Sequence, residues 1–197
     1  MTDRIAWVVF AVSYLWGSLL PARLVIHRAT GKSAEELQEN PGGGATWRLA
    51  GPLGGGLVMF LDIAKGVIPV ATVTALALSP AALIAAAVAP VIGHNWPVWK
   101  PLRGGRGFAT ATGVFFALAF VPMFPSYLIG AVAWLFRHWL PLIGVVAWPI
   151  GLVSSFYMHL PQPTLTAMVL VVAITLLRQI PWLFTNTETI KRELFSR

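Results

Sequence analysis

The residues best suited to chemistry lie in a glycine-rich segment at 93–113, GHNWPVWKPLRGGRGFATATG, which interrupts an otherwise apolar chain. Glycines let backbone N–H groups approach an anion, and a helix that follows would present its positively polarised N-terminus. Arginine adds forked donors that match phosphate oxygens. A phosphate site is therefore predicted at Arg103, Gly104, Gly105, Arg106 and Gly107. The alternative is a flexible turn whose arginines only follow the cation bias of membrane loops.

Three further ionisable residues lie inside or beside apolar segments. Asp62 and Lys65, in LDIAKG, are three residues apart and would share one face of a helix. Because ionisable groups inside a membrane are costly, such a pair either anchors a substrate or neutralises itself and fixes helix packing, and we favour the second role. His94 could act as a general base at the membrane surface. A histidine bonded to a neighbouring helix end is the simpler interpretation.

The composition indicates an integral membrane protein. Hydrophobic residues make up 57% of the 197 residues and charged residues 11%, which is far from the balance of a soluble domain. The net charge of +7 does not indicate nucleic-acid binding, because the cytoplasmic bias of loops gives a basic membrane protein the same value. The chain has no cysteine and its four histidines are far apart, so we expect no metal site.

Hydropathy predicts an all-α polytopic bundle that forms a single domain over residues 1–197. A helix needs about 20 mostly apolar residues to cross a bilayer. Seven segments are predicted to cross: 5–26, 54–78, 80–95, 108–122, 125–137, 139–157 and 164–184. Five or six crossings are the alternatives, because the fourth and fifth segments are short and only PMFP separates them. They could be two tilted spans, a re-entrant pair or a broken helix.

The distribution of cations predicts the orientation of this bundle. If the N-terminus faces outward, twelve of the fourteen Lys and Arg residues lie at or next to the inner face, with Arg4 and Lys65 as the exceptions. This asymmetry is the one that the positive-inside rule describes, so we expect the C-terminus and the glycine-rich segment to be cytoplasmic. The first apolar segment lacks a clear cleavage site and is interpreted as retained. SAEEL predicts a capping box and a short interfacial helix near Ser33.

Six short motifs occur in an order that resembles one known family. They are Gly17-Ser18, GAT at 44–46, LDIAKG at 61–66, GH..PV at 93–98, GGRGFAT at 104–110 and IKREL at 190–194. The chain thereby resembles the bacterial acyl-phosphate:glycerol-3-phosphate acyltransferases, the PlsY family. The resemblance implies a seven-helix enzyme of the inner (plasma) membrane with its site facing the cytoplasm. Such an enzyme would move an acyl group from acyl phosphate to glycerol 3-phosphate without metal, coenzyme A or other cofactor.

The resemblance also assigns roles to residues. It implies that the glycine-rich motif, with Thr110 added, binds glycerol phosphate, and that the two family lysines there are replaced by arginines at 103 and 106. Five residues would support the site: Thr46, Arg48, Asp62, Lys65 and His94. Lys191 or Arg192 could add charge near the donor phosphate.

Departures from the family pattern affect the reacting groups. ENPGGGAT stands where the family has GSGNxGAT, so Asn40 replaces the serine, and Arg48 matches a family arginine only across a two-residue gap. NTETI replaces HxxNI, which puts Asn186 at the histidine and Thr189 at the asparagine. No catalytic residue is assigned. Two interpretations remain: an acyltransferase that is active or attenuated, and a degenerate paralogue that serves as a structural or lipid-binding subunit of a larger membrane assembly.

Overall fold

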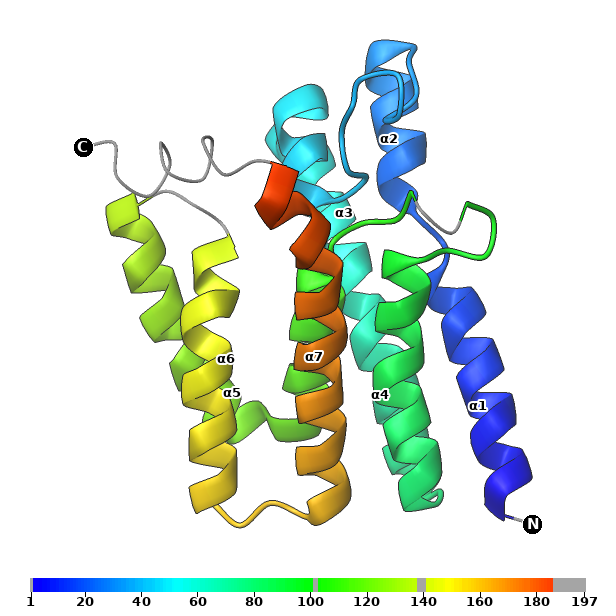
Figure 1. Ribbon diagram of the computed structural model, residues 1–197, viewed down its shortest axis with the longest axis vertical. Coiled ribbons are helices and arrows are strands. Elements are labelled where there is room, and N and C mark those ends of the chain that lie inside the picture. The colour runs from blue at the N-terminus through cyan, green and yellow to red at the C-terminus, as the bar shows by residue number, and fades with distance from the viewer. Residues whose placement is uncertain (1, 101–102, 138–140, 186–197) are drawn as a thin grey trace.

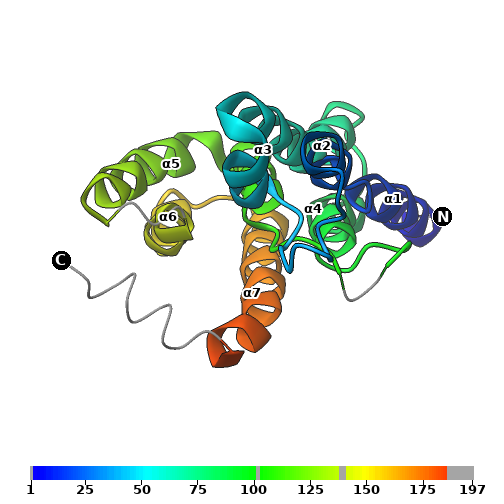
Figure 2. The same cartoon turned by 90° about the horizontal axis from the view of Figure 1, so that it is seen from above.

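The computed structural model describes residues 2–100, 103–137 and 141–185, and the regular structure within these ranges is helical. The helices are α1 (Thr2–Gly17), α2 (Pro21–Thr30), α3 (Gly43–Ala75), α4 (Pro80–Asn95), α5 (Phe108–Arg137), α6 (Pro141–Tyr157) and α7 (Gln162–Thr185). They form one bundle with α5 and α6 at one edge and α1 at the other (Figure 1, Figure 2). The predicted all-α fold class is confirmed.

The helices have the lengths and compositions of membrane spans. Within the described residues, four stretches are long and apolar enough to cross a bilayer: Arg4–Thr30, Gly43–Ala75, Phe108–Val132 and Gln162–Ile180. Two shorter apolar helices lie at Pro80–Asn95 and Val146–Tyr157. Helices are suited to the apolar interior of a bilayer because each helix satisfies its backbone hydrogen bonds within its own segment.

The polar connections gather at one end of the bundle. Segments 31–42 and 96–107 lie at the end where α2 and the last turns of α7 are found, whereas the short connections at 76–79 and 158–161 lie at the opposite end (Figure 1). This grouping is the one that the cation distribution predicts. A site for a water-soluble substrate is therefore expected at the end that carries the two long segments.

The first apolar segment, predicted to cross at 5–26, lies within one stretch that is long and apolar enough to cross, Arg4–Thr30, but its helix is broken in two. α1 ends at Gly17, and α2 begins at Pro21, where the fixed φ of proline suits the first helical position. Between them, the Ser18 hydroxyl donates to the Tyr14 carbonyl at 2.8 Å and accepts from the Val98 N–H at 3.2 Å. The break thus serves to anchor segment 96–107 against the top of α1.

Helix α3 is a hairpin of two helices. At Gly51 the backbone leaves the helical region, with φ 76° and ψ 179°. Met59 Cβ lies 3.3 Å from the position that a Cβ on Gly43 would occupy, and a Cβ on Gly55 would contact the Trp47 backbone at 2.7 Å. Residues 43–50 therefore fold back along the beginning of the long arm. The sequence places the start of this span at residue 54 and does not predict the short arm.

Helix α5 also folds back on itself. Ala119 has non-helical φ and ψ of −152° and 53°, and the Tyr127 hydroxyl donates to Thr112 Oγ1 at 3.1 Å across the two arms. Of the three alternatives for this region, a helix broken into antiparallel arms is correct, but the turn precedes PMFP. The arm before Ala119 has eleven residues. It is therefore about 16 Å long, roughly half of a bilayer core.

The SAEEL segment forms a capped turn and no helix, so the predicted interfacial helix is wrong. The capping box itself is present: the Ser33 N–H donates to a Glu36 carboxylate oxygen at 2.6 Å, and the Glu36 N–H donates to Ser33 Oγ at 3.2 Å. Gln38 then adopts a positive φ of 55°, which stops helical propagation after one turn.

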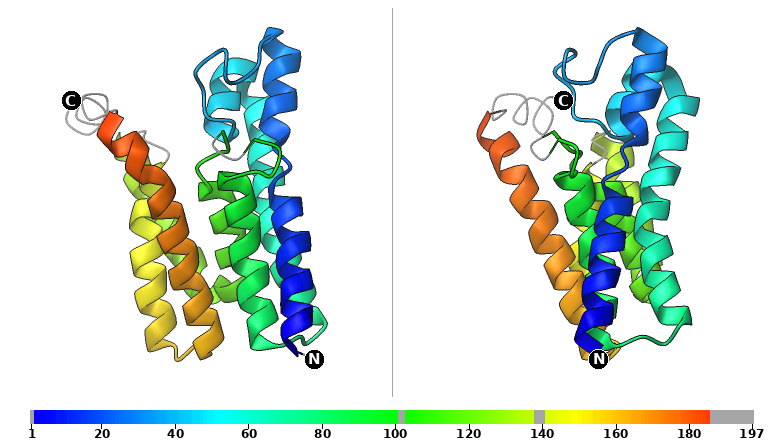
Figure 3. Two further views of the ribbon diagram at one scale, coloured as in Figure 1. Left: turned by 45° about the vertical axis from the view of Figure 1, so that its right-hand side comes forward. Right: turned by 90° about the vertical axis from the view of Figure 1, so that its right-hand side faces the viewer.

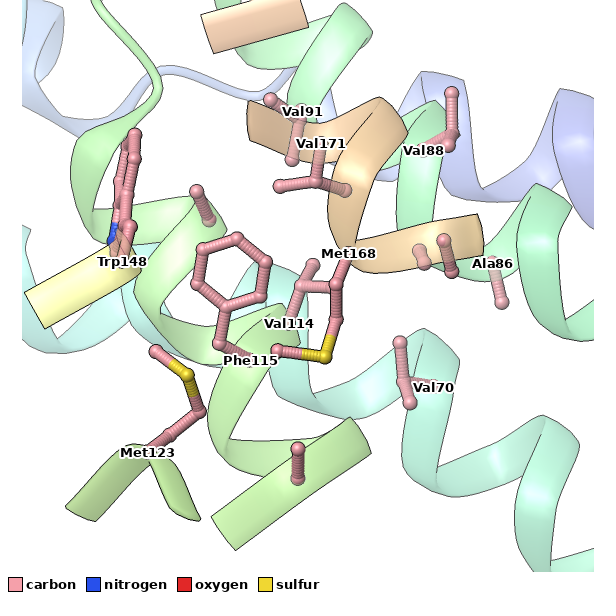
Figure 4. Packing of buried hydrophobic residues seen from close by; sticks show 14 of the residues in the cluster. Val70, Ala86, Val88, Val91, Val114, Phe115, Met123, Trp148, Met168 and Val171 are labelled. Atoms are coloured by element: carbon pink, nitrogen blue, oxygen red, sulfur yellow. The ribbon is translucent and has the colours of Figure 1, made fainter. Parts of the chain in front are cut away.

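The principal core lies where five helices meet. Val70, Val91, Phe115, Trp148 and Met168 contribute one side chain each from α3, α4, α5, α6 and α7, and all are buried (Figure 4). A second, smaller cluster joins α2 to α3 and to the capped turn through Ala22, Ile26, Ala34, Ala45 and Val58. α2 accordingly continues above α1 and runs beside α3 (Figure 3).

Candidate active site

The glycine-rich loop packs directly on the C-terminal end of α4. The Gly105 N–H donates to the His94 carbonyl at 2.9 Å. A Cβ on Gly104 would overlap the backbone at Asn95, one on Gly105 would overlap the His94 imidazole, and one on Gly107 would contact the Asn95 amide. Gly107 also has a φ of 78°, which side chains rarely adopt. These glycines are thus required for close packing, in addition to any contact with an anion.

Helix α7 holds the other side of the same loop. The Arg178 guanidinium donates to the Gly104 and Gly105 carbonyls, each at 3.2 Å, and the Gln179 amide donates to the Arg106 carbonyl at 3.1 Å. Carbonyl oxygens repel anions, and here three consecutive ones are bound to donors of α7. These hydrogen bonds reduce the repulsion between the carbonyl oxygens and an anion at the loop, and they restrain the loop geometry.

A buried ionic cluster lies beneath the loop. Lys65 Nζ and Asp62 Oδ1 are 2.7 Å apart, and His94 Nδ1 lies 3.6 Å from the same oxygen. All three side chains are no more than 4% exposed. The self-neutralising pair that LDIAKG predicts is confirmed as an ion pair. Asp62 and Lys65 both belong to α3, and Asp62 reaches α4 through His94. Removal of one partner of the ion pair would leave an uncompensated buried charge.

Helices α3 and α5 approach closely enough to bring Thr110 to this cluster. A Cβ on Gly66 would overlap the Thr110 carbonyl, and one on Gly113 would overlap the carbonyl of Ile63. Small residues allow such backbone contact between membrane helices. Thr110, in the first turn of α5, therefore sits next to the α3 turn that carries Lys65.

Several buried polar atoms converge here without partners. Among the described residues, His94 Nδ1, both amide atoms of Asn95 and Thr110 Oγ1 are buried and make no hydrogen bond. Each such group costs about 1–3 kcal/mol, and native proteins hold few of them. They lie next to the N-terminus of α5, where the first N–H groups of a helix have no partner within it and attract anions. The arrangement is suited to a small polar ligand that carries negative charge.

The structure brings most of the predicted site residues together. The loop with Arg103 and Arg106, the first turn of α5, and the Asp62 cluster are adjacent. Arg103 is exposed and Arg106 is half-buried.

Two predicted supporting residues lie in a different segment. The Thr46 hydroxyl donates to the Gly42 carbonyl at 2.9 Å, and Arg48 forms an ion pair with Glu39 at 2.8 Å. Asn40, at the position of the family serine, is exposed. The predictions at Asn186, Thr189, Lys191 and Arg192 fall outside the described residues.

Sequence reasoning missed Asn95, Arg178 and Gln179. Asn95 follows His94 at the end of an apolar helix, where a buried amide is unexpected. Arg178 and Gln179 interrupt the predicted span 164–184 several residues before its end, and polar groups at such a depth indicate function or specific pairing. The sequence contains this signal, but the positive-inside rule by itself groups Arg178 with the cations of the inner face.

Fold and site together define a polytopic helical membrane protein with a cationic, glycine-lined polar site at one end of the bundle. The family model described as glycerol-3-phosphate acyltransferase matches residues 7–192. The chain belongs to the glycerol-3-phosphate acyltransferase family, as the motifs predicted.

Curated relatives agree with this assignment. Glycerol-3-phosphate acyltransferase 4 of Dehalococcoides mccartyi is 38% identical over 162 residues, which cover 72% of this chain and 87% of the relative. The glycerol-3-phosphate acyltransferase of Pseudomonas fluorescens is 33% identical over 173 residues, which cover 83% of this chain and 89% of the relative.

The fold matches solved structures over nearly its whole length. A crystal structure of PlsY (YgiH), an integral membrane glycerol 3-phosphate acyltransferase in its lysophosphatidic acid form, is 28% identical with a TM-score of 0.80. The match covers 98% of this chain and 93% of that one. The glycerol 3-phosphate form of the same enzyme is 26% identical with a TM-score of 0.79 and the same coverage. The prediction of an integral membrane bundle is confirmed.

Proposed function

We propose that this protein transfers an acyl group from acyl phosphate to the first hydroxyl of glycerol 3-phosphate. The bond between the acyl carbon and the phosphate oxygen breaks, an ester bond to the glycerol oxygen forms, and inorganic phosphate leaves with the hydroxyl proton. Products are 1-acyl-glycerol 3-phosphate and inorganic phosphate. Membership of the family supports the reaction class. The observation that carries the proposal for this chain is the set of buried polar atoms of His94, Asn95 and Thr110 that make no hydrogen bond and lie beside the glycine-rich loop.

The glycerol phosphate is proposed to bind between the loop and the first turn of α5. Its phosphate would accept hydrogen bonds from the N–H groups at the start of α5 and from Thr110 Oγ1, while Arg103 and Arg106 supply positive charge. Asn95 can orient the glycerol hydroxyls, since its amide offers both a donor and an acceptor. Binding through these groups leaves the acceptor hydroxyl free to meet the donor.

The chemistry is proposed to depend mainly on positioning and on anion stabilisation. An acyl phosphate is already activated, so holding both substrates in line contributes much of the acceleration. The loss of one acid–base group, as at Asn40, lowers a rate by about two to four orders of magnitude. Turnover that is slow but measurable is therefore expected, with no metal or other cofactor.

The site is proposed to face the cytoplasm from the inner (plasma) membrane. Segments 31–42 and 96–107 hold Lys32, Lys100, Arg103 and Arg106 at one end of the bundle, which is the end that the positive-inside rule places inside. Glycerol 3-phosphate is water-soluble and reaches that face directly, and the acyl donor reaches it from the bilayer.

A defined assay tests the proposal. Purified protein is incubated with synthetic acyl phosphate and glycerol 3-phosphate, and the product lipid and inorganic phosphate are measured separately. Equal amounts of both products, formed only when both substrates are present, are expected. Hydrolysis of acyl phosphate without any product lipid would contradict the proposal.

A second candidate is a catalytically degenerate paralogue that acts as a structural or lipid-binding subunit of a membrane complex. The observation that favours it is Asn40, which replaces the family serine and lies exposed to solvent. Extraction from the native membrane in mild detergent separates the two candidates. Stoichiometric co-purification with other subunits, together with no release of phosphate from acyl phosphate, would favour the subunit.

A further inference from the structure

Each of the four consecutive carbonyls at residues 103–106 accepts a hydrogen bond from a side chain of α2 or α7. Arg23, in α2, donates to the first of them at 2.6 Å. Arg178, in α7, donates to the second and third, each at 3.2 Å, and Gln179 donates to the fourth at 3.1 Å. The backbone of the glycine-rich loop is therefore held by side chains of two helices that are far apart in the sequence.

The direction of these carbonyls also decides where the N–H groups of the loop point. In a trans peptide the C=O and the N–H that follows it lie in one plane and point in opposite directions. Every peptide bond among the described residues is trans. Donors that fix the carbonyls of residues 103–106 therefore also fix the N–H groups of residues 104–107. The side chains of α2 and α7 thus determine how the backbone donors of the loop are presented to an anion.

Arg178 is placed for this role by contacts within the protein. It lies in the stretch Gln162–Ile180, which is long and apolar enough to cross a bilayer, and an ionisable side chain in such a stretch usually faces the protein interior. Its guanidinium carbon lies 5.9 Å from the centre of the Trp96 ring, within the range of a cation–π interaction. Trp96 is in turn held by α1, because the Tyr14 hydroxyl donates to its carbonyl at 2.9 Å.

Arg23 differs from Arg178 because it also holds segment 31–42. Glu35 Oε1 lies 2.8 Å from Arg23 Nη2 and 3.6 Å from Lys100 Nζ. The same Nη2 group donates to the loop, so a change at Arg23 would release segment 31–42 together with the loop. Arg178 is therefore the better residue at which to test what the hold on the loop carbonyls does.

We propose that Arg178 is a positioning residue for phosphate binding. Its planar guanidinium bridges two adjacent carbonyls and keeps the loop in the conformation that receives the phosphate of glycerol 3-phosphate. Arg178 itself does not contact that phosphate. The inference rests on the proposed function, because that function places the phosphate at the loop. It gives α7 a part in the affinity for the acceptor substrate and no part in the transfer step.

Equilibrium binding of radiolabelled glycerol 3-phosphate to the purified full chain tests this role. Arg178→Met removes the donors but keeps a long unbranched side chain, and it is expected to raise the dissociation constant about tenfold, which corresponds to about 1.4 kcal/mol. Arg178→Lys keeps a cation but loses the planar fork, so a smaller rise is expected. Leu177→Met is the matched control, because Leu177 is the neighbouring residue of α7 and is 58% exposed. It is expected to bind like the parent protein.

Steady-state kinetics separates positioning from a general loss of structure. In Arg178→Met the KM for glycerol 3-phosphate is expected to rise about tenfold while kcat changes less than about twofold, because the interaction that is lost serves binding and not the transfer step. A protein that is only destabilised would contain fewer active molecules, which lowers kcat and leaves KM unchanged.

The possible results are distinct. Binding of glycerol 3-phosphate by Arg178→Met that equals the parent protein would overturn the role of Arg178, and so would a lower kcat with an unchanged KM. Binding by Arg178→Lys that equals the parent protein would overturn the requirement for the fork. Absence of product lipid, with the expected differences in binding present, would reject the proposed function alone.

Discussion

At Gly105 the loop passes so close to α4 that a Cβ would overlap the His94 imidazole. We therefore expect Gly105→Ala to displace the loop and to lower acyltransferase activity severely while the protein still folds. Gly56→Ala is the control, because a Cβ on Gly56 would meet no atom within 4 Å. Activity and thermal unfolding of both variants are measured in detergent. Full activity in Gly105→Ala would mean that this packing does not hold the site.

Arg106 is the half-buried cation of the loop, and its guanidinium is proposed to face the substrate phosphate. Hydrogen bonds to charged groups are worth about 1.5–3 kcal/mol, so Arg106→Ala should raise the KM for glycerol 3-phosphate by about ten- to a hundredfold. Arg28→Ala removes an exposed cation from the last turn of α2 and should leave this KM unchanged. An unaltered KM in Arg106→Ala would reject the role of the loop in phosphate binding.

Much of the site could be predicted from residue types. RGGRG, LDIAKG and His94 are visible because cations, glycines or ionisable groups interrupt apolar sequence. The unpartnered amide of Asn95 could not be predicted, since its burial depends on how the loop folds over α4. The hydrogen bonds from Arg178 to the loop carbonyls join residues more than seventy positions apart, so they could not be predicted from the sequence either.

At the scale of elements, the turn inside α3 depends on one glycine. Gly51 has a combination of φ and ψ that is essentially restricted to glycine, and residues with other side chains in such regions cost about 1–3 kcal/mol. Gly51→Ala is expected to destabilise the protein by about that amount, measured as a loss of thermal stability relative to Gly56→Ala. Equal stability of the two variants would contradict a fixed turn at this position.

Hydropathy located the apolar segments but could not show where they fold back. Gly51 stands three residues before the glycines at 54–56. The pair Gly51-Pro52 is a turn signal, but the short arm is recognised only from the packing of Gly55 on Trp47. Ala119 has no helix-breaking character of its own. The break comes one turn before Pro122, which has no N–H to donate to the carbonyl of residue 118, and the hydrogen bond from Tyr127 to Thr112 then joins the two arms. PMFP was the stronger local signal, yet Pro122 and Pro125 lie within the second arm of α5.

For the whole molecule, Glu35 joins three regions: α2, the capped turn and segment 96–107. Partial burial raises the pKa of Glu35, but a backbone hydrogen bond and the charges of Arg23, Lys100 and Arg103 outweigh it and hold the pKa below its ordinary value of 4.5. A lowered carboxylate pKa stabilises the fold above pH 4.5, and this contribution is lost as the pH falls through the lowered value.

Limited proteolysis of segment 31–42 as a function of pH should detect this loss. Cleavage in the parent protein is expected to accelerate below pH 4.5, whereas Glu35→Gln should be cleaved faster at neutral pH and show a smaller acceleration. The same pH profile in both proteins would mean that Glu35 does not hold the segment.

The most direct measurement is equilibrium binding of radiolabelled glycerol 3-phosphate to the purified protein, with Thr110→Val as the test variant and unlabelled phosphate or glycerol as competitors. This experiment measures binding at the proposed phosphate site and does not require turnover. We predict that the parent protein binds the label, that inorganic phosphate competes far better than glycerol, and that Thr110→Val binds more weakly. Undiminished binding in both Thr110→Val and Arg106→Ala would place the phosphate elsewhere and contradict the account.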